Sequence, residues 1–158
     1  MQIRSDRRYR FEVERAALWR EIAEPRRYTE WWPWLRGFDA EALAPGVRWR
    51  CVIQPPLPYT LRVDVDIVEV VEGVAVSADV SGDLLGHARI SLGDGDGRVS
   101  DGFASNGHCE ARVVSSLAPS SRFMGVAAWL AAPMARWGHD WVLSTGARQL
   151  QEALRDPR

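Results

Sequence analysis

The sequence contains no lysine, so all 20 of its basic residues are arginine. Without a lysine amine, a Schiff-base enzyme, a pyridoxal-phosphate site and a phosphate-binding loop that ends in lysine are excluded. The arginines are balanced by 21 acidic residues, which leaves a net charge of −1. So small a net charge favours neither nucleic acid nor an anionic membrane surface, and we expect no nucleic-acid partner.

Cysteines and long apolar runs are also scarce. The two cysteines, Cys51 and Cys109, form no C-x-x-C pair, so we predict two reduced, buried thiols. The longest weakly polar stretch covers residues 123–134, well short of the roughly 20 residues that a membrane-spanning helix needs. No apolar run follows the arginine-rich first residues, which therefore do not read as a secretory signal. We expect a soluble cytoplasmic protein with no membrane span.

What the chain has in surplus is tryptophan: eight, against four phenylalanines and three tyrosines. Tryptophan supplies a large, rigid surface with one polar N–H group. With 158 residues, and about 100 to 200 residues in a typical domain, the length predicts a single domain over residues 1–158. No internal repeat or linker divides the chain.

The spacing of apolar residues predicts the order of the elements. Alternation over Arg8–Val13 predicts a first strand. Helical spacing then begins at Glu14 and is stopped by Pro25, and a second short helical segment ends at Pro33. Six further strands are predicted between recognisable turn signals: Arg36–Leu43, Val47–Gln54, Tyr59–Val71, Val74–Val80, Leu84–Leu92 and His108–Leu117. Connections this short favour antiparallel neighbours.

The last third of the sequence, residues 121–155, has a helical composition. Pro133 predicts a break or kink, because a proline inside a helix costs about 3 kcal/mol, and a principal helix over Met134–Leu154 follows it. On a helical wheel Met134, Trp137 and Trp141 share one stripe. We expect this tryptophan stripe to face inward.

Four segments, taken in order, carry a resemblance to a known superfamily. They are FEVERAALWREI (11–22) with RYTEWWP (27–33), LPYTLR (57–62), GDLLG (82–86) and RWGHDWVLSTG (136–146). Together they resemble the START-like, polyketide cyclase/dehydrase superfamily, also called SRPBCC. The stretch Arg98–Gly107 departs from that pattern, because it is extra sequence at a place where we expect a tight hairpin.

The resemblance implies an α+β, helix-grip fold. In that fold a curved antiparallel sheet, here of about seven strands, wraps around a long C-terminal helix, and two short helices follow the first strand. A cavity lies between the sheet and the last helix. The superfamily includes lipid carriers, cyclases and hydroxylase domains, so the fold by itself does not assign the chemistry.

The expected function is to bind a small apolar or aromatic molecule, lipid-like or polyketide-like, in that cavity without a cofactor. Such sites are lined mainly by apolar and aromatic side chains. The predicted ligand-binding residues are Trp31, Trp49, Tyr59, Leu61, Val63, Trp129, Met134, Trp137 and Trp141. Alternatively, the tryptophans are ordinary core residues, because each buries roughly 150 to 250 Å² and together they could fill the cavity.

A second hypothesis is an enzyme, a cyclase or dehydratase that uses the same cavity. His87 and His139 are its candidate acid or base groups. Asp140 follows His139, but neighbours on a helix point about 100° apart, so we expect Asp140 to pair with Arg136. A His-Asp pair also occurs in metal-dependent phosphohydrolases, but their metal centre needs further histidines. The sequence has only three histidines in all, and we predict no metal site.

A third hypothesis is an interaction module with a filled core. It predicts an exposed apolar patch around Trp31, Trp32 and Trp34. For the ligand-binding hypothesis we expect a small hydrophobic ligand as the partner. We expect the protein itself to be a monomer or a homodimer.

Overall fold

One antiparallel sheet holds all seven strands, in the order β1-β7-β6-β5-β4-β3-β2. The computed structural model describes residues 2–56, 60–94, 107–120 and 132–155, the side chains of 132–136 excepted. Its strands are β1 (Ile3–Phe11), β2 (Leu35–Asp39), β3 (Arg48–Ile53), β4 (Leu61–Val71), β5 (Ala75–Gly82), β6 (Leu84–Asp94) and β7 (Cys109–Pro119). Consecutive strands from β2 to β7 pair with each other, and β1 closes the order beside β7.

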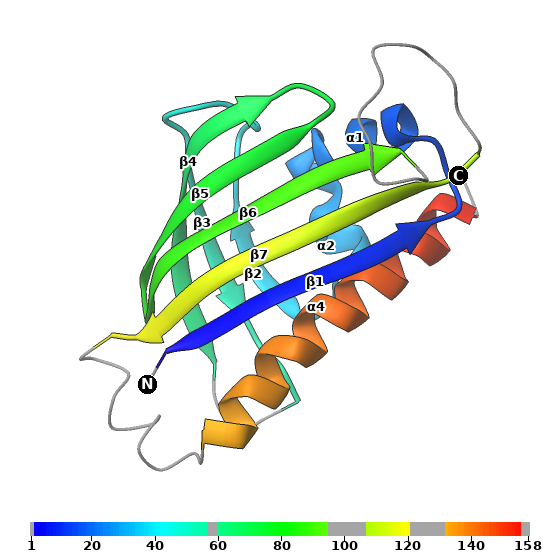
Figure 1. Cartoon of the computed structure of the whole chain (residues 1–158). Helices are drawn as coiled ribbons and strands as arrows, with labels where there is room; N and C mark the ends of the chain where they lie inside the picture. The colour runs from blue at the N-terminus through cyan, green and yellow to red at the C-terminus, as the bar shows by residue number, and fades with distance from the viewer. Residues whose placement is uncertain (1, 57–59, 95–106, 121–131, 156–158) are drawn as a thin grey trace.

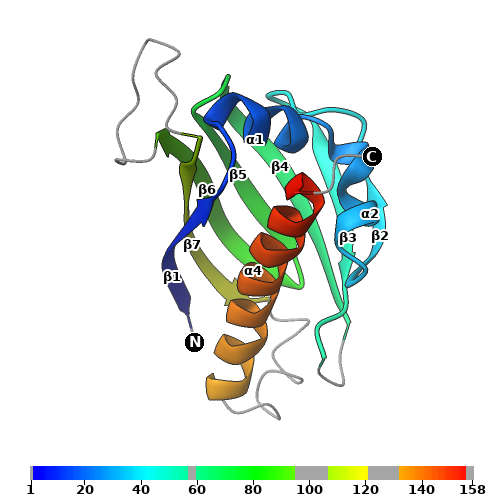
Figure 2. The same cartoon turned by 90° about the vertical axis from the view of Figure 1, so that its right-hand side faces the viewer.

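The helices lie on the concave side of this sheet. They are α1 (Arg15–Ile22), the 3₁₀ turn η1 (Pro25–Arg27), α2 (Tyr28–Trp31) and α4 (Ala132–Arg155). Figure 1 shows the sheet curving over α4, and Figure 2 shows α4 running across the concave face with α1 at one end and α2 beside β2. The predicted α+β, helix-grip architecture is confirmed.

The first strand differs from its prediction at both ends. It begins at Ile3 rather than Arg8, ends at Phe11 rather than Val13, and pairs with β7 over nine residues. Arginine, serine and aspartate fill positions 4–8, so no apolar alternation marks this part of the strand. Its backbone pairing and the ion pair between Asp6 and Arg112 (Oδ1 to Nε, 2.8 Å) hold it in the sheet instead.

Bulges and glycines curve the sheet. The strand register shifts between Leu35 and Gly37 in β2 and between Ile67 and Glu69 in β4, and such bulges bend a strand and increase its twist. In the GDLLG segment, Gly82 and Gly86 have φ of +100° and +152°. A Cβ on Gly86 would lie 1.9 Å from the carbonyl oxygen of Ser116, so only glycine fits this close approach.

The predicted C-terminal helix is present. It begins two residues before Met134, and Pro133 stands in its first turn, where the missing N–H group has no intrahelical partner to lose. The predicted helical composition of residues 121–131 lies outside the described residues. None of the described helices is long and apolar enough to cross a membrane.

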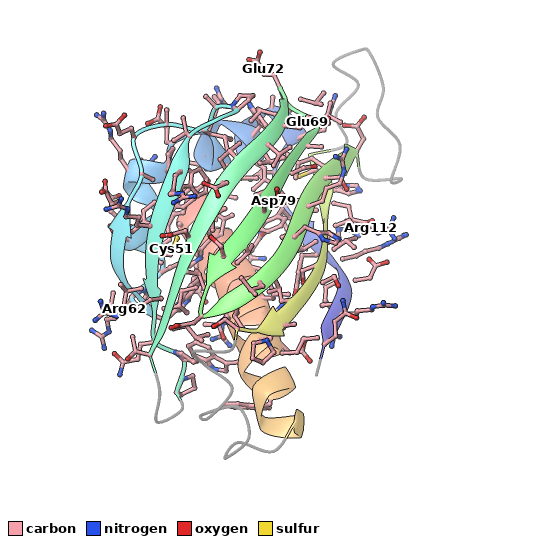
Figure 3. The ribbon with its side chains drawn as sticks, turned by 90° about the vertical axis from the view of Figure 1, so that its left-hand side faces the viewer. Cys51, Arg62, Glu69, Glu72, Asp79 and Arg112 are labelled. Atoms are coloured by element: carbon pink, nitrogen blue, oxygen red, sulfur yellow. The ribbon has the colours of Figure 1, made fainter. Side chains whose placement is uncertain are left out.

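The convex face of the sheet carries charged side chains in pairs. Figure 3 views the molecule from this side, with α4 behind the sheet. Arg48 binds Asp66 (Nε to Oδ1, 2.7 Å) and approaches Asp64. Its guanidinium donates to the Asp66 carboxylate and thereby lowers the pKa of that group. The polar face of β4 is therefore partly solvated and partly paired.

Candidate functional site

A cavity of about 290 Å³ lies between the concave face of the sheet and the helices. Its walls come from strands β1 and β3 to β7, from α1, from α2 and the segment after it, from the segment between β2 and β3, and from α4. The described residues that line it are Tyr9, Phe11, Leu18, Ile22, Tyr28, Trp32, Trp34, Leu43, Trp49, Val65, Ile67, Val76, Ala78, Ala88, Arg89, Ile90, Ala111, Val113, Val142, Leu143, Gly146, Ala147 and Leu150. An apolar wall with few polar groups is typical of small-molecule sites.

Two tryptophans bind α4 directly through their indole N–H groups. Trp32 donates to the carbonyl oxygen of Gly146 (2.9 Å), and Trp34 donates to Oε1 of Gln149 (3.0 Å). A Cβ on Gly146 would lie 3.3 Å from Trp34 Cζ2 and 3.4 Å from Trp32 Nε1. The absence of a side chain at Gly146 therefore lets both rings approach the helix.

Tyr28 stands at the centre of the aromatic side of the cavity. Its ring stacks on Phe38 (5.5 Å between centroids) and meets Trp49 edge to face (5.7 Å). The Tyr28 hydroxyl donates to the carbonyl oxygen of Ile22, and burial raises the pKa of that phenol. We call Tyr28, Trp32, Trp34 and Trp49 the aromatic flank.

The opposite side of α4 meets β1 and β7 through polar side chains. Ser115 Oγ lies 3.2 Å from His139 Nε2, and His139 Nδ1 lies 3.6 Å from Asp140 Oδ1. Asp140 Oδ2 in turn accepts a hydrogen bond from Arg7 (3.1 Å). We call Arg7, Ser115, His139 and Asp140 the polar flank.

The polar flank lies beside one end of the cavity. Val113, two residues before Ser115 on the same face of β7, lines the cavity, and so does Val142, one helical turn after His139. His139 is largely buried, with 13% of its side chain exposed. Among the described residues, no group of three or more His, Cys, Asp or Glu side chains is placed to hold a metal ion.

Only some of the predicted ligand-binding residues that the structure describes line the cavity. Trp49 lines the cavity. Trp49 and Cys51 share a face with Val63, since Cys51 pairs with Val63. Val63 and Trp31 are buried in the core, and Leu61 is partly buried, but none of the three lines the cavity. Tyr59 and Trp129, together with the side chain of Met134, lie outside the described residues.

The expected inward orientation of the tryptophan stripe on α4 is wrong for Trp137. Half of its side chain is exposed, and neither Trp137 nor the partly buried Trp141 lines the cavity. The inward stripe contains Leu143 and Gly146 instead. Because Trp141 lies two residues before Leu143, the two point about 200° apart on a helix with 3.6 residues per turn. Where Trp32 and Trp34 approach α4, the helix presents Gly146, which has no side chain.

The two candidate acid or base histidines also separate. His139 joins the polar flank, whereas His87 is exposed on the outer face of β6, opposite Asp79. In the described structure Asp140 pairs with Arg7 and lies near His139. The side chain of the predicted partner, Arg136, lies outside the described residues.

Several lining residues are absent from the predicted ligand-binding set. Tyr9 and Phe11 were already on one face of a predicted strand, so alternation could have found them. Trp32 and Trp34 could not be assigned a direction, because a four-residue helix followed by Pro33 has no reliable period.

The two cysteines are free and buried, as predicted. Burial, and to a smaller extent the charge of Asp64, raises the pKa of Cys51 to about 12. Burial likewise raises the pKa of Cys109 to about 11. Because the thiolate is the nucleophilic form, neither thiol is activated at neutral pH.

Comparison with known proteins identifies the fold. No protein-family model matches the sequence, and no curated protein sequence is significantly similar to it. Solved structures do match over nearly the whole chain. A START superfamily protein from Mycobacterium smegmatis superposes with a TM-score of 0.71 at 10% identity, covering 96% of this chain and 97% of the other.

Two further structures share the same architecture. Ara h 8.0201 matches with a TM-score of 0.66 at 12% identity, over 98% of this chain and 99% of its own. Norcoclaurine synthase from Thalictrum flavum, solved in complex with dopamine and hydroxybenzaldehyde, matches with a TM-score of 0.63 at 8% identity, over 100% and 89%. The chain therefore has the START-like, SRPBCC helix-grip fold.

Proposed function

We propose that the chain binds one small apolar or aromatic molecule in the cavity between the sheet and α4. The observation that carries this proposal is the cavity of about 290 Å³ with its aliphatic and aromatic wall. Protein interiors are normally packed to crystal density, so an apolar space of this size leaves its wall without contacts that a ligand can supply. Burying apolar surface there is favourable by about 25 cal/mol per Å².

The structural neighbours support the same class of ligand. Norcoclaurine synthase, which shares the fold, holds dopamine and hydroxybenzaldehyde, both small aromatic compounds. The aromatic flank of the present cavity offers Trp32, Trp34 and Trp49 for contact with a flat ring. A lipid-like or polyketide-like ligand fits the rest of the apolar wall.

Binding of the neutral fluorophore 1-aminoanthracene tests the proposal. We expect its emission to rise and shift to shorter wavelength on saturable, one-to-one binding, because it enters an apolar environment. Fatty acids and flat polycyclic compounds are then tested as competitors that displace it. A signal that does not saturate, or that no competitor lowers, contradicts a single cavity site.

A matched pair of helix variants locates the bound probe. Ala147 lines the cavity, whereas Ser144 is exposed on the same helix. We expect Ala147→Leu, which fills part of the cavity, to weaken binding at least about 10-fold, in line with the loss of apolar contact area. Ser144→Leu should leave the affinity unchanged. Equal affinities for the two variants would place the probe elsewhere.

A second function, acid or base chemistry of the cyclase or dehydratase type, is favoured by one observation. His139 is hydrogen-bonded to Ser115 beside the end of the cavity, with Asp140 and Arg7 behind it. An imidazole so placed could take a proton from a carbon next to a ligand carbonyl, leaving an enolate, and then return it.

Proton exchange tests this second function without knowledge of the substrate. In deuterated buffer, a base at the cavity would exchange the acidic C–H protons of the bicyclic ketone 2-tetralone, which mass spectrometry detects. We expect His139→Gln to reduce the protein-dependent exchange rate about 10-fold or more. His87→Gln, on the outer face, serves as the control. Equal rates for both variants and the unaltered chain exclude His139 as the base.

A further inference from the structure

The described wall of the cavity turns apolar atoms almost exclusively toward the open space. Six of its side chains nevertheless contain a nitrogen or oxygen atom, and they are Tyr9, Tyr28, Trp32, Trp34, Trp49 and Arg89. The direction of these polar atoms decides which chemical groups a bound ligand can carry, because a hydroxyl, a carbonyl or a charge needs a partner once it has left water.

The three tryptophans direct their indole N–H groups to protein acceptors. Trp32 and Trp34 donate to α4, and Trp49 donates to the carbonyl oxygen of Ala42 at 2.8 Å. An indole has one N–H donor and no acceptor, so these side chains have no hydrogen-bonding capacity left. Toward the cavity they offer only apolar ring surface.

The two tyrosine hydroxyls are also withdrawn from the open space. Tyr28 donates to the carbonyl oxygen of Ile22, the last residue of α1, where a helix leaves carbonyl groups without partners of its own. The Tyr9 hydroxyl is buried so completely that it does not reach the cavity. Both tyrosines therefore line the cavity with their rings.

Arg89 is the one charged side chain among the described lining residues, and it points away from the cavity. It is exposed on the convex side of the sheet, where it donates to Ser77 Oγ (2.6 Å) and its Nη1 lies 3.6 Å from Oε1 of Glu69 (Figure 3). Backbone groups of the strands lie in the plane of the sheet and bind neighbouring strands. The described wall thus directs neither a charge nor a hydrogen-bonding group at a ligand.

We propose that the ligand is a compact, uncharged molecule of hydrocarbon character, with no hydroxyl, carbonyl or charged group on the part that the cavity encloses. This inference rests on the proposed function and narrows it, because it excludes oxygen-rich polyketide-like compounds and buried carboxylates. A volume of about 290 Å³ is near the lower end of the range of about 300 to 1,000 Å³ for ligand pockets, so the molecule is compact.

Specificity then comes from the cost that the wall imposes on polar molecules rather than from a directed bond. A polar analogue of the same shape makes the same apolar contacts, but it gives up its hydrogen bonds to water and receives none in return. A buried charge without a partner is more unfavourable still. The acid or base chemistry of the second function needs a ligand carbonyl, so it is the alternative to this inference.

Equilibrium dialysis of the unaltered chain against three naphthalene compounds at pH 7 tests the inference. 2-Methylnaphthalene and 2-naphthol have nearly the same shape and differ by a methyl group in place of a hydroxyl. We expect 2-methylnaphthalene to bind at least about 10-fold more tightly, because the hydroxyl loses its water partners. Anionic 2-naphthoate should bind at least about 100-fold more weakly than 2-methylnaphthalene.

Ala147→Leu and Ser144→Leu show whether this preference belongs to the cavity. Ala147 lines the cavity, whereas Ser144 is exposed on the same helix. Affinity for 2-methylnaphthalene should fall at least about 10-fold in Ala147→Leu, which takes up space in the cavity, and should not change in Ser144→Leu. Equal affinities of the two variants would mean that the compound binds elsewhere, and the inference about this wall would fail.

The outcomes separate the two levels of the proposal. Comparable affinities for 2-naphthol and 2-methylnaphthalene, tight binding of 2-naphthoate, or exchange of 2-tetralone protons that depends on His139 overturns the hydrocarbon ligand while the cavity site stands. Failure of the unaltered chain to bind any of the three naphthalene compounds or 1-aminoanthracene overturns the proposed function and this inference together.

Discussion

The two sides of α4 are attached to the rest of the molecule by different chemistry. On the aromatic flank, uncharged indole N–H groups of Trp32 and Trp34 bind the helix, and Gly146 leaves space for the rings. On the polar flank, the helix is bound by the Arg7–Asp140 ion pair and the Ser115–His139 hydrogen bond. The cavity lies between the two.

Because of this difference, the two flanks should respond to different changes, the aromatic flank to side-chain volume and the polar flank to salt. The aromatic flank is neutral and depends on close packing, so its contribution to stability should respond to changes of volume and hardly to salt. The Arg7 and Asp140 side chains are 54% and 30% exposed, so the polar flank should respond to ionic strength and contribute less. Four measurements test this comparison.

The largest effect is expected from Gly146→Val. A Cβ alone would already lie 3.3 Å from Trp34 Cζ2, and two further methyl groups must push the rings or the helix away. Overpacking of this kind typically costs about 1 to 3 kcal/mol, and we expect the loss in the free energy of unfolding to lie in the upper half of that range. Urea unfolding followed by circular dichroism measures it.

Ser144→Val is the control for this variant, because Ser144 is exposed on the same helix and the substitution introduces the same β-branched residue. Its effect should stay within about 0.5 kcal/mol. If both variants lose the same stability, helix propensity rather than the packing of Trp32 and Trp34 explains the result.

The second-largest effect is a loss of stability at alkaline pH, caused by the buried thiol of Cys51 near the aromatic flank. Cys51 lies two residues from Trp49, and burial raises the pKa of its thiol from the ordinary value of 9.0 to about 12. Between these values the unfolded thiol loses its proton and the folded thiol keeps it, so the folded state binds more protons and stability falls as pH rises. The slope is about 1.4 kcal/mol per pH unit for one thiol, or roughly 2 kcal/mol lost by about pH 10.5.

Cys51→Ala checks this assignment. Its stability at pH 7 should be lower, because a buried group is removed, but its decline between about pH 9 and pH 10.5 should be shallower by about one proton. The raised pKa of Tyr28 adds a loss of the same sign above about pH 10. Parallel pH profiles for Cys51→Ala and the unaltered chain would contradict a contribution from this thiol.

The sequence predicted the order of the elements. Short connections between alternating segments leave few topologies, and the hairpin that joins β3 to β4 places Cys51 opposite Val63. Alternation has a period of two, so once one face is buried the register is determined. These are local patterns, and the sequence carries them directly.

The direction of the tryptophans on the helices could not be predicted in the same way. Hydrophobic spacing marks Trp137 and Trp141 as one stripe, but it does not reveal that rings from residues 32 and 34 occupy the space in front of α4. Tertiary contacts 114 and 115 residues apart in the sequence decide which stripe faces inward. The half-exposed Trp137 is the consequence.

The third effect concerns the hydrogen bond within the polar flank. Ser115 is 5% exposed and bound to His139, so Ser115→Ala should cost about 1 kcal/mol in the free energy of unfolding. Its neighbour Ser116 lies on the outer face and accepts a hydrogen bond from Gln2 in an exposed setting. Ser116→Ala is therefore the control, with an expected loss near zero. Equal losses would mean that the inward bond adds nothing.

The smallest effect is expected for the ion pair of the polar flank. A double-mutant cycle with Arg7→Gln and Asp140→Asn isolates the coupling between the two charges, which we expect to be about 0.5 kcal/mol, because both side chains are partly exposed. The coupling should shrink at about 1 M salt, where the Debye length is about 3 Å. The cycle for Trp34→Phe and Gln149→Ala, on the aromatic flank, should keep its value in the same salt. If salt weakens both couplings alike, the two sides of α4 do not differ in the way that their contacts indicate.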